Sequence, residues 1–271
     1  MINDTSKEFI RRHIGPSEKD IDKMLSAVGA NSLDDLIKKT VPDNILLKDK
    51  LKIGDPTSEH ESMKQIKAIS EKNKLYKNYI GMGYYNTYMP NVILRNIYCN
   101  PGWYTAYTPY QPEVAQGRLE MLLNFQQMIL DFTGMDIANA SLLDESTAAA
   151  EAIGLSHRLN KSNSNKIFIS NDCNPQTIDV IKTRTEVFGL KLVVGDQEKD
   201  LENLEENIIC GVLQYPGTLG DIKDPSEAIS RIHKKNGKAI LICDLLALAK
   251  LKTPAELGAD IAVGNSQRFG I

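Results

Sequence analysis

Short apolar runs alternate with helical segments over the second half of this chain of 271 residues. The runs with the length and apolar content of buried strands lie at 166–170, 191–195, 208–216, 239–244 and 260–264. Helical segments are predicted at 146–159, 176–187 and 225–235. Strands that alternate with helices predict an α/β fold, in which helices cover both faces of a mostly parallel sheet. Ligands of such sheets bind beyond the carboxyl ends of the strands, so a site is expected in the loops after Ser170, Tyr215 and Asp244.

The first 75 residues are polar, rich in lysine and helical in pattern. Pro16-Ser17-Glu18 and Ser32 each have the form of a helix start, Gly29 has the form of a helix end, and a third helix is expected over 57–72. We interpret segment 1–75 as a helical N-terminal arm that wraps a neighbouring domain or subunit and carries no chemistry of its own.

The remainder of the chain, 76–271, is predicted to form one large domain in three parts. Loops rich in aromatic residues occupy 76–111. Pro112 then opens a long helix over 112–133, because proline is favoured in a first helical turn and apolar side chains recur on one face. The α/β part covers 140–271.

Aromatic side chains are crowded into one window of the sequence. Nine of the ten tyrosines and the only tryptophan lie between Tyr76 and Tyr110. Glycines and prolines interrupt this window, and its apolar residues follow neither a helical nor a strand period. Tyrosine offers a rigid apolar face with a polar tip, which suits the wall of a ligand site or a subunit contact. The other interpretation is a loop that packs against its own domain.

Long motifs start in this window and continue after it. They read GMGYYNT (81–87), NPGWYTAYTPYQPE (100–113), QGRLEMLLNFQ (116–126) and SLLDESTAAAEA (141–152). Together with FIRRHIGPS (9–17) and SQRFG (266–270), they resemble the P-protein family of the glycine cleavage system over nearly the whole chain. That family is built from two related halves, either fused or separate, and this chain resembles the N-terminal half. The chain stops at Ile271, shortly after a predicted strand, and we expect it to be a truncated part of that half.

The resemblance implies a fold and a reaction. The fold is the large domain of a fold-type I pyridoxal-phosphate transferase, incomplete and preceded by the helical arm. The family's reaction is that of glycine dehydrogenase (decarboxylating): glycine is bound through pyridoxal phosphate, carbon dioxide is released, and the aminomethyl group passes to the lipoyl group of H-protein. The implied partners are therefore glycine, the catalytic C-terminal half or subunit, and lipoylated H-protein.

Three residues that the resemblance relates to the cofactor are also explained by helix capping. Ser146 and Thr147 lie at a predicted helix start, where the cofactor phosphate binds in fold-type I enzymes and where free amides favour an anion. They are equally explained as helix caps, and the neighbouring Asp144 and Glu145 disfavour a phosphate. Asp244 ends an apolar strand, where such enzymes place an aspartate that pairs with the pyridinium nitrogen. It is also explained as the cap of the next helix.

Three further positions depart from the catalytic pattern. Asn174 stands where the family usually has a histidine, and asparagine neither titrates near neutrality nor stacks as well. Gln267-Arg268 stands where the catalytic half has a His-Lys pair whose lysine forms the Schiff base. An arginine stays protonated and supplies no neutral amine for an imine. Lys250 and Lys252 follow the strand of Asp244 and are not expected to replace it. We therefore predict that this chain has no catalytic lysine, is inactive alone, and leaves covalent binding of the cofactor to the other half.

The predicted contribution of this chain is to the wall of a shared active site. The candidate wall residues are Tyr84, Tyr85, Asn86, Trp103, Tyr104, Thr105, Tyr107 and Tyr110. An alternative from another class is a purely structural half that stabilises the catalytic half and docks H-protein. An unrelated aminotransferase is disfavoured because no Schiff-base lysine is present.

Composition and missing motifs exclude several other classes. A net charge of −3 gives no reason to expect nucleic acid or an anionic membrane as a partner. No apolar stretch approaches the roughly 20 residues of a membrane span. The four cysteines are widely spaced, so neither a metal site nor a disulfide framework is expected, and the predicted location is the cytoplasm. GMGYY lacks the spacing of a dinucleotide-binding loop, and no GxSxG or HExxH motif occurs.

Overall fold

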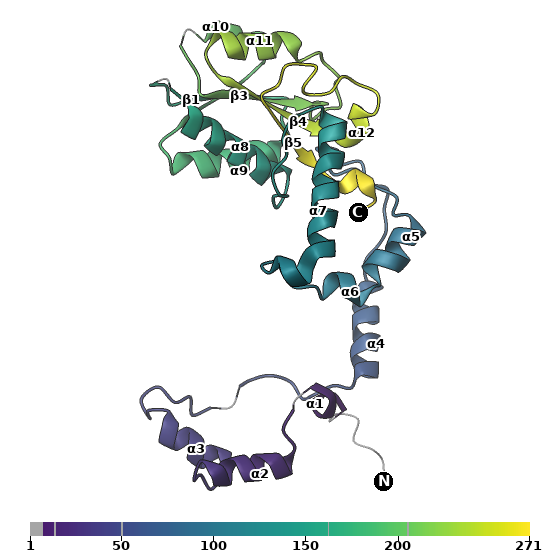
Figure 1. The fold of residues 1–271 in the computed structure, drawn as a ribbon, viewed down its shortest axis with the longest axis vertical. Helices are drawn as coiled ribbons and strands as arrows, with labels where there is room; N and C mark the ends of the chain where they lie inside the picture. Colours follow the sequence, from purple (N-terminus) through teal and green to yellow (C-terminus); the bar gives the residue numbers. More distant parts are fainter. Residues whose placement is uncertain (1–7, 14, 50, 162, 205) are drawn as a thin grey trace. The chain divides into compact units, whose positions relative to one another are not determined.

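In a computed structural model of the chain, the structure describes residues 8–13, 15–49, 51–161, 163–204 and 206–271 (Figure 1). The chain divides into two compact units, Met1–Lys77 and Asn78–Ile271. None of the helices in the described ranges is long and apolar enough to cross a membrane.

The first unit is a set of short helices with polar caps. They are α1 (Glu8–His13), α2 (Glu18–Ala27), α3 (Leu33–Thr40) and α4 (Glu59–Ser70). The Ser17 hydroxyl accepts a hydrogen bond from the amide of Asp20, and Ser32 caps α3 in the same way, because a side-chain oxygen satisfies an amide that has no partner within the helix. The three helices predicted in this segment are confirmed. Leu25 and Ala30 are the buried apolar residues among those that the structure describes here.

The aromatic window, at the start of the second unit, contains more helix than the sequence predicted. Its short helical turns are α5 (Asn91–Ile93), the π-helical turn η2 (Leu94–Tyr98) and α6 (Pro101–Tyr104). The prediction of loops throughout 76–111 is therefore corrected over 91–104. The reason for α6 is local: Pro101 occupies its first turn, and the Asn100 side chain accepts a hydrogen bond from the amide of Gly102.

The long helix α7 spans Pro112–Thr133, as predicted. It ends at Gly134, whose φ of +70° is left-handed and suits glycine. A Cβ atom at Gly134 would lie 3.0 Å from the Thr253 hydroxyl, so this glycine also allows close packing.

The five predicted strands form one parallel sheet in the order β2-β1-β3-β4-β5. The strands are β1 (Lys166–Ser170), β2 (Lys191–Gly195), β3 (Cys210–Tyr215), β4 (Lys238–Asp244) and β5 (Ile261–Asn265). The helices of this part are α8 (Glu145–Leu159), α9 (Pro175–Glu186), α10 (Asp200–Asn203), α11 (Ser226–Lys234), α12 (Leu245–Leu248) and the 3-10 turn η3 (Gln267–Phe269). The predicted α/β architecture is confirmed.

Two cores form because alternate strand residues face opposite sides of the sheet. Ile167 and Ile169 of β1 pack in one core with Ile153 of α8 and Ile181 of α9. Phe168 packs in the other core, with residues of α11 and α7. Figure 1 shows α8 and α9 on one side of the sheet and α10 and α11 on the other. All carboxyl ends of the strands meet at one edge, which is where the site lies.

Candidate functional site

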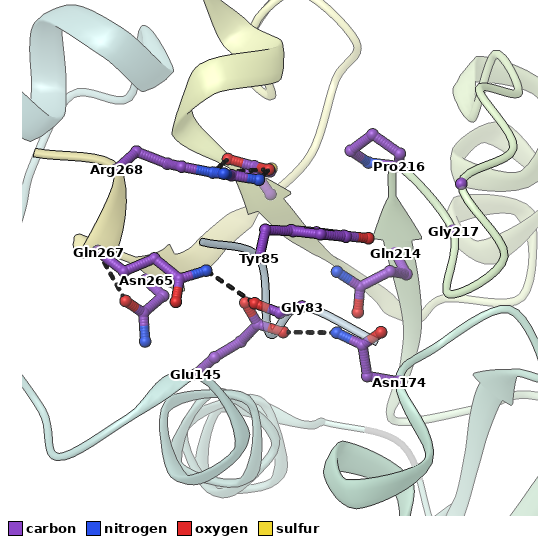
Figure 2. Close-up of a pocket in the computed structure, with 13 residues that line it drawn as sticks. Gly83, Tyr85, Glu145, Asn174, Gln214, Pro216, Gly217, Asn265, Gln267 and Arg268 are labelled. Carbon is purple, nitrogen blue, oxygen red and sulfur yellow. Dashed lines mark hydrogen bonds and ion pairs between the residues drawn. The ribbon is translucent and has the colours of Figure 1, made fainter. Parts of the chain in front are cut away.

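A pocket of about 180 Å³ opens at the carboxyl edge of the sheet (Figure 2). Its lining comes from the start of α8, the loop before α9, the ends of β3, β4 and β5, and the turn η3. Gly83 and Tyr85 of the aromatic window also line it, although they are far away in the sequence. The pocket thus lies where the strand pattern predicted a ligand site.

Arg268 and Asp244 form an ion pair in this pocket. The Arg268 Nη2 atom lies 2.6 Å from Asp244 Oδ2, and Nε lies 3.0 Å from Oδ1. Both side chains are largely buried, with exposed fractions of 16% and 22%. The hydrogen bond to Asp244 raises the pKa of Arg268 above its usual value, so the guanidinium stays charged. The predicted capping role of Asp244 is confirmed as well, since its Oδ1 accepts a hydrogen bond from the amide of Leu246.

Tyr85 lies against the other side of Arg268. The Arg268 Cζ atom is 4.8 Å from the centroid of the Tyr85 ring, a distance at which a cation is attracted to the ring face. Figure 2 shows the ring extending from below Arg268 across the pocket toward Gln214. The neighbouring Gln267 donates a hydrogen bond of 2.7 Å from Nε2 to the carbonyl of Gly83. The side chains of Tyr85 and Gln267 therefore occupy part of the pocket.

Glu145 and Asn174 form a second polar contact at the floor of the pocket. Asn174, which is 3% exposed, donates a hydrogen bond of 3.1 Å from Nδ2 to Glu145 Oε1. Burial is the main cause that raises the pKa of Glu145, and the negative charge of Asp244 adds to it. The hydrogen bond from Asn174 opposes both effects. Glu145 thus places a carboxyl group at the start of α8.

The hydroxyl groups at that helix start have partners within the protein. Asp144, rather than Ser146 or Thr147, is the N-cap, and its Oδ1 accepts a hydrogen bond of 2.7 Å from the amide of Thr147. The Thr147 hydroxyl lies 2.6 Å from the same oxygen, and this contact lowers the pKa of Asp144. Ser146 Oγ is buried and lies 3.0 Å from Thr177 Oγ1. Capping therefore accounts for this helix start, with Asp144 as the cap.

The predicted wall residues do not gather around one site. Tyr85 lines the pocket with its side chain 40% exposed, and Tyr84 and Asn86 beside it are exposed and do not line it. Three others line a separate groove of about 770 Å³ beside the start of α7: Trp103, Tyr107 and Tyr110. Tyr104 and Thr105 lie next to that groove and are exposed, and the Thr105 hydroxyl donates a hydrogen bond to the carbonyl of Pro101. The window thus contributes to two places.

A family model described as glycine cleavage system P-protein matches residues 11–271. This chain belongs to the glycine cleavage system P-protein family. It is 71% identical over its whole length to a glycine dehydrogenase (decarboxylating) of Pelagibacter ubique (strain HTCC1062), of which it covers 28%. It is 52% identical over 263 residues, 97% of the chain, to the enzyme of the same name from Nostoc sp. (strain PCC 7120 / SAG 25.82 / UTEX 2576), of which it covers 27%. The chain thus spans little more than a quarter of the length of these curated relatives.

Solved structures show the same relationship. A crystal structure of glycine decarboxylase (P-protein) in inhibitor-bound form matches with a TM-score of 0.82 at 30% identity, over 94% of this chain and 58% of that chain. The cystine C-S lyase C-DES matches with a TM-score of 0.54 at 12% identity, over 70% of this chain and 53% of that one, which supports the fold alone. The second unit therefore has the mostly parallel sheet of the fold-type I pyridoxal-phosphate enzymes, as predicted.

The pocket of this P-protein chain does not fit that cofactor. None of the described residues that line it is a lysine, and Arg268, which the sequence predicts to stand at the Schiff-base position, is paired with Asp244. The Tyr85 ring takes up part of the space. Glu145 adds a carboxyl group at the helix start where a phosphate would need amides and hydroxyl groups, so like charges would repel. Cys243, which also lines the pocket, is 2% exposed, and burial raises the pKa of its thiol, which leaves it unreactive.

Three residues of this region were not identified as site residues from the sequence. Glu145 was noted only as unfavourable to phosphate, and its contact with Asn174 depends on the fold. Gln214 had a signal, because it is a polar residue within an apolar strand. Gln176 had none. It donates a hydrogen bond of 2.7 Å to the carbonyl of Met82, which only the path of the aromatic window brings near.

Proposed function

We propose that this chain is the accessory N-terminal part of a glycine decarboxylase whose cofactor is held by another part of the protein. The observation that carries the proposal is the ion pair between Arg268 and Asp244. It joins the residue at the Schiff-base position to the residue that would pair with the cofactor ring, so neither is available to the cofactor. Tyr85, which packs on Arg268, supports the same conclusion.

The complete protein would carry out the reaction of its family. Glycine is bound through pyridoxal phosphate, carbon dioxide is released, and the aminomethyl group is transferred to the lipoyl group of H-protein. The cofactor supplies the electron sink for this chemistry. Membership of the P-protein family and 71% identity to a glycine dehydrogenase (decarboxylating) support this assignment. The partners of this chain would be the catalytic half, fused or separate, and lipoylated H-protein.

The contribution of this chain would be a set of aromatic residues presented to the catalytic half. Tyr84 is 56% exposed and lies beside the pocket. Tyrosine rings at a subunit contact exclude water and still offer a hydrogen bond, which suits a small site for glycine.

The four cysteines are free thiols, three of them buried, which agrees with a cytoplasmic location.

A second candidate function is favoured by the groove beside α7. Tyr107 and Tyr110 are 81% and 77% exposed, and Trp103 and Arg118 line the same groove. An exposed aromatic groove away from the pocket suits a docking surface, so this half would then be structural and would bind H-protein.

An absorbance experiment tests the main proposal. The purified chain is mixed with pyridoxal phosphate, alone and together with the catalytic half, and spectra are recorded before and after borohydride reduction. We expect no specific reduced lysine adduct in this chain, and glycine-dependent spectral change with release of carbon dioxide once the catalytic half is present. A reduced adduct at one specific lysine of this chain would overturn the proposal.

A further inference from the structure

The pocket that does not fit the cofactor holds a segment of the chain instead. We define this segment as residues 82–88. Figure 2 shows Gly83 and Tyr85 among Asn174, Gln267 and Arg268, which come from the loop before α9 and the turn η3. The family's cofactor positions on this chain are thus in contact with the aromatic window.

Two glutamine side chains bind the backbone of segment 82–88. Gln176 Nε2 donates a hydrogen bond of 2.7 Å to the carbonyl of Met82, and Gln267 Nε2 donates one of 2.7 Å to the carbonyl of Gly83. Both acceptors are main-chain oxygens, so the contacts set the path of the chain and do not depend on side chains of the segment. Two successive carbonyls are therefore held from two different elements of the α/β part.

The backbone of the segment is shaped for this contact. Met82 and Gly83 have φ values of +54° and +86°, so two successive residues are left-handed. A Cβ atom at Gly83 would lie 3.0 Å from the Asn174 Nδ2 atom. Only glycine combines this φ with so close an approach. The turn is closed by a hydrogen bond of 2.9 Å from the amide of Tyr84 to the carbonyl of Gly81.

Arg268 adds a third contact, through a side chain. Asp244 holds its guanidinium, which then lies over the Tyr85 ring. Because the ion pair fixes the orientation of the guanidinium, the ring beneath it is held in one place. At the end of the segment the backbone passes close to Gly270: a Cβ atom there would lie 3.1 Å from the Tyr88 carbonyl oxygen, so a glycine allows this approach.

The side chains that these contacts leave outside are the exposed tyrosines. Tyr84 is 56% exposed and Tyr88 is 96% exposed, whereas Tyr85 beneath Arg268 is 40% exposed and Met82 and Gly83 are half-buried. We propose that Gln176, Gln267 and Arg268 are positioning residues: they hold segment 82–88 in the pocket and thereby present Tyr84 and Tyr88 to the catalytic half. The contacts above support the part of the proposal that concerns how segment 82–88 is held. The presentation of Tyr84 and Tyr88 to the catalytic half rests on the proposed function.

Hydrogen exchange measured by mass spectrometry tests the holding of the segment in the complete protein that contains this chain. The variants are Gln267→Ala, Gln176→Ala and the double variant Arg268→Met/Asp244→Asn, which removes the ion pair without leaving a buried charge. We expect amides of 82–88, that of Tyr84 included, to exchange about fivefold faster in each single variant and faster still in the double variant. Peptides of β1 and β3 should be unchanged.

Arg184→Met is the matched control. It also removes an arginine–carboxylate pair, with Glu151, but this pair is exposed and lies on α9 and α8. Its exchange over 82–88 should equal that of the unchanged protein. If the double variant also loosens β4 and β5, the two glutamine variants decide the matter. Unchanged exchange of 82–88 in both of them would overturn the proposal.

Glycine turnover of the same proteins separates the two steps. Faster exchange of 82–88 with a lower kcat and an unchanged cofactor content supports both the holding of the segment and its catalytic use. Faster exchange with unchanged turnover supports the holding of the segment and overturns the presentation of Tyr84 and Tyr88 to the catalytic half. In neither case does the result depend on cofactor binding by this chain.

Discussion

Arg268 and Asp244 face one another across the carboxyl edge of the sheet and share three hydrogen bonds, from Nη2 to Oδ2 at 2.6 Å and from Nε to Oδ1 at 3.0 Å and to Oδ2 at 3.2 Å. Arginine matches a carboxylate with two parallel donors, which lysine cannot do. The pair is therefore an internal contact of the fold, in which the charge of each side chain is balanced by the other. Removing this pair should therefore lower the free energy of unfolding by more than removing an ion pair on the surface does.

Arg268→Met should lower the free energy of unfolding by about 2 kcal/mol, because it leaves the largely buried Asp244 without its partner. Arg184→Met, which breaks a pair with exposed fractions of 52% and 45%, should cost about 0.5 kcal/mol. Urea unfolding followed by circular dichroism measures both values. Arg268→Met/Asp244→Asn should regain part of the loss, and equal losses for the two single variants would contradict the prediction.

Glu145 should make stability depend on pH. Burial raises its pKa in the folded state, so the folded protein holds the proton more tightly than the unfolded chain does. The stabilisation is complete below the ordinary pKa of a glutamate, about 4.3, and is lost as the pH rises through the higher folded value. Glu145→Gln removes this pH-dependent loss of stability. The free energy of unfolding of the variant, minus that of the unchanged protein, should therefore increase as the pH rises from about 4 and then level off.

Unfolding in urea at a series of pH values measures this difference. Glu186→Gln, on an exposed position in the last turn of α9, is the matched control for the same substitution on the surface. A constant difference between Glu145→Gln and the unchanged protein across the series would count against a shifted pKa at Glu145.

Gly83→Ala should be more costly than Gly81→Ala. Both positions have a left-handed φ, +86° and +68°, so an alanine is strained at either one. A Cβ atom at Gly81 meets nothing within 4 Å, whereas at Gly83 it meets the Asn174 amide at 3.0 Å. We expect the free energy of unfolding to fall by about 1 kcal/mol in Gly81→Ala and by about 2 kcal/mol in Gly83→Ala. The larger loss is expected because Asn174 is hydrogen-bonded to Glu145 and cannot move away freely. Thermal unfolding of the two variants makes the comparison, and similar melting temperatures would refute it.

Tyr84→Ala and Tyr107→Ala should separate the two proposed functions in the complete enzyme. If Tyr84 belongs to the wall of the active site, its removal should lower kcat for glycine by about tenfold, since small errors in positioning are costly. If the groove beside α7 is a docking surface, Tyr107→Ala should leave kcat for glycine unchanged and weaken the binding of H-protein, so the KM for H-protein should rise. Steady-state kinetics with glycine and with H-protein varied in turn give both answers. Intact turnover in Tyr84→Ala and Tyr84→Phe would remove Tyr84 from the wall.

Local patterns were sufficient for most of the fold. The strands at 166–170 and 191–195 were predicted to the residue, because each carries its signal in its own run of apolar side chains. The helix α7 was predicted from Pro112 to Thr133, because proline is favoured in a first helical turn and apolar side chains recur on one face. The short helices at 91–104 were missed, since a single turn has too few residues to show a period.

By itself, the sequence determined that the chain has an α/β sheet and that it carries the motifs of the P-protein family, and it predicted that arginine stands at the position of the Schiff-base lysine. Only the tertiary structure decided what that arginine does. The parallel register of β4 and β5 sets Asp244 beside Asn265 and so brings η3 within reach, and the path of the aromatic window places Tyr85 under Arg268. These contacts join residues far apart in the chain, and no local period records them. The same path separates Tyr84 and Tyr85 from Trp103, Tyr107 and Tyr110, which the sequence had placed in one wall.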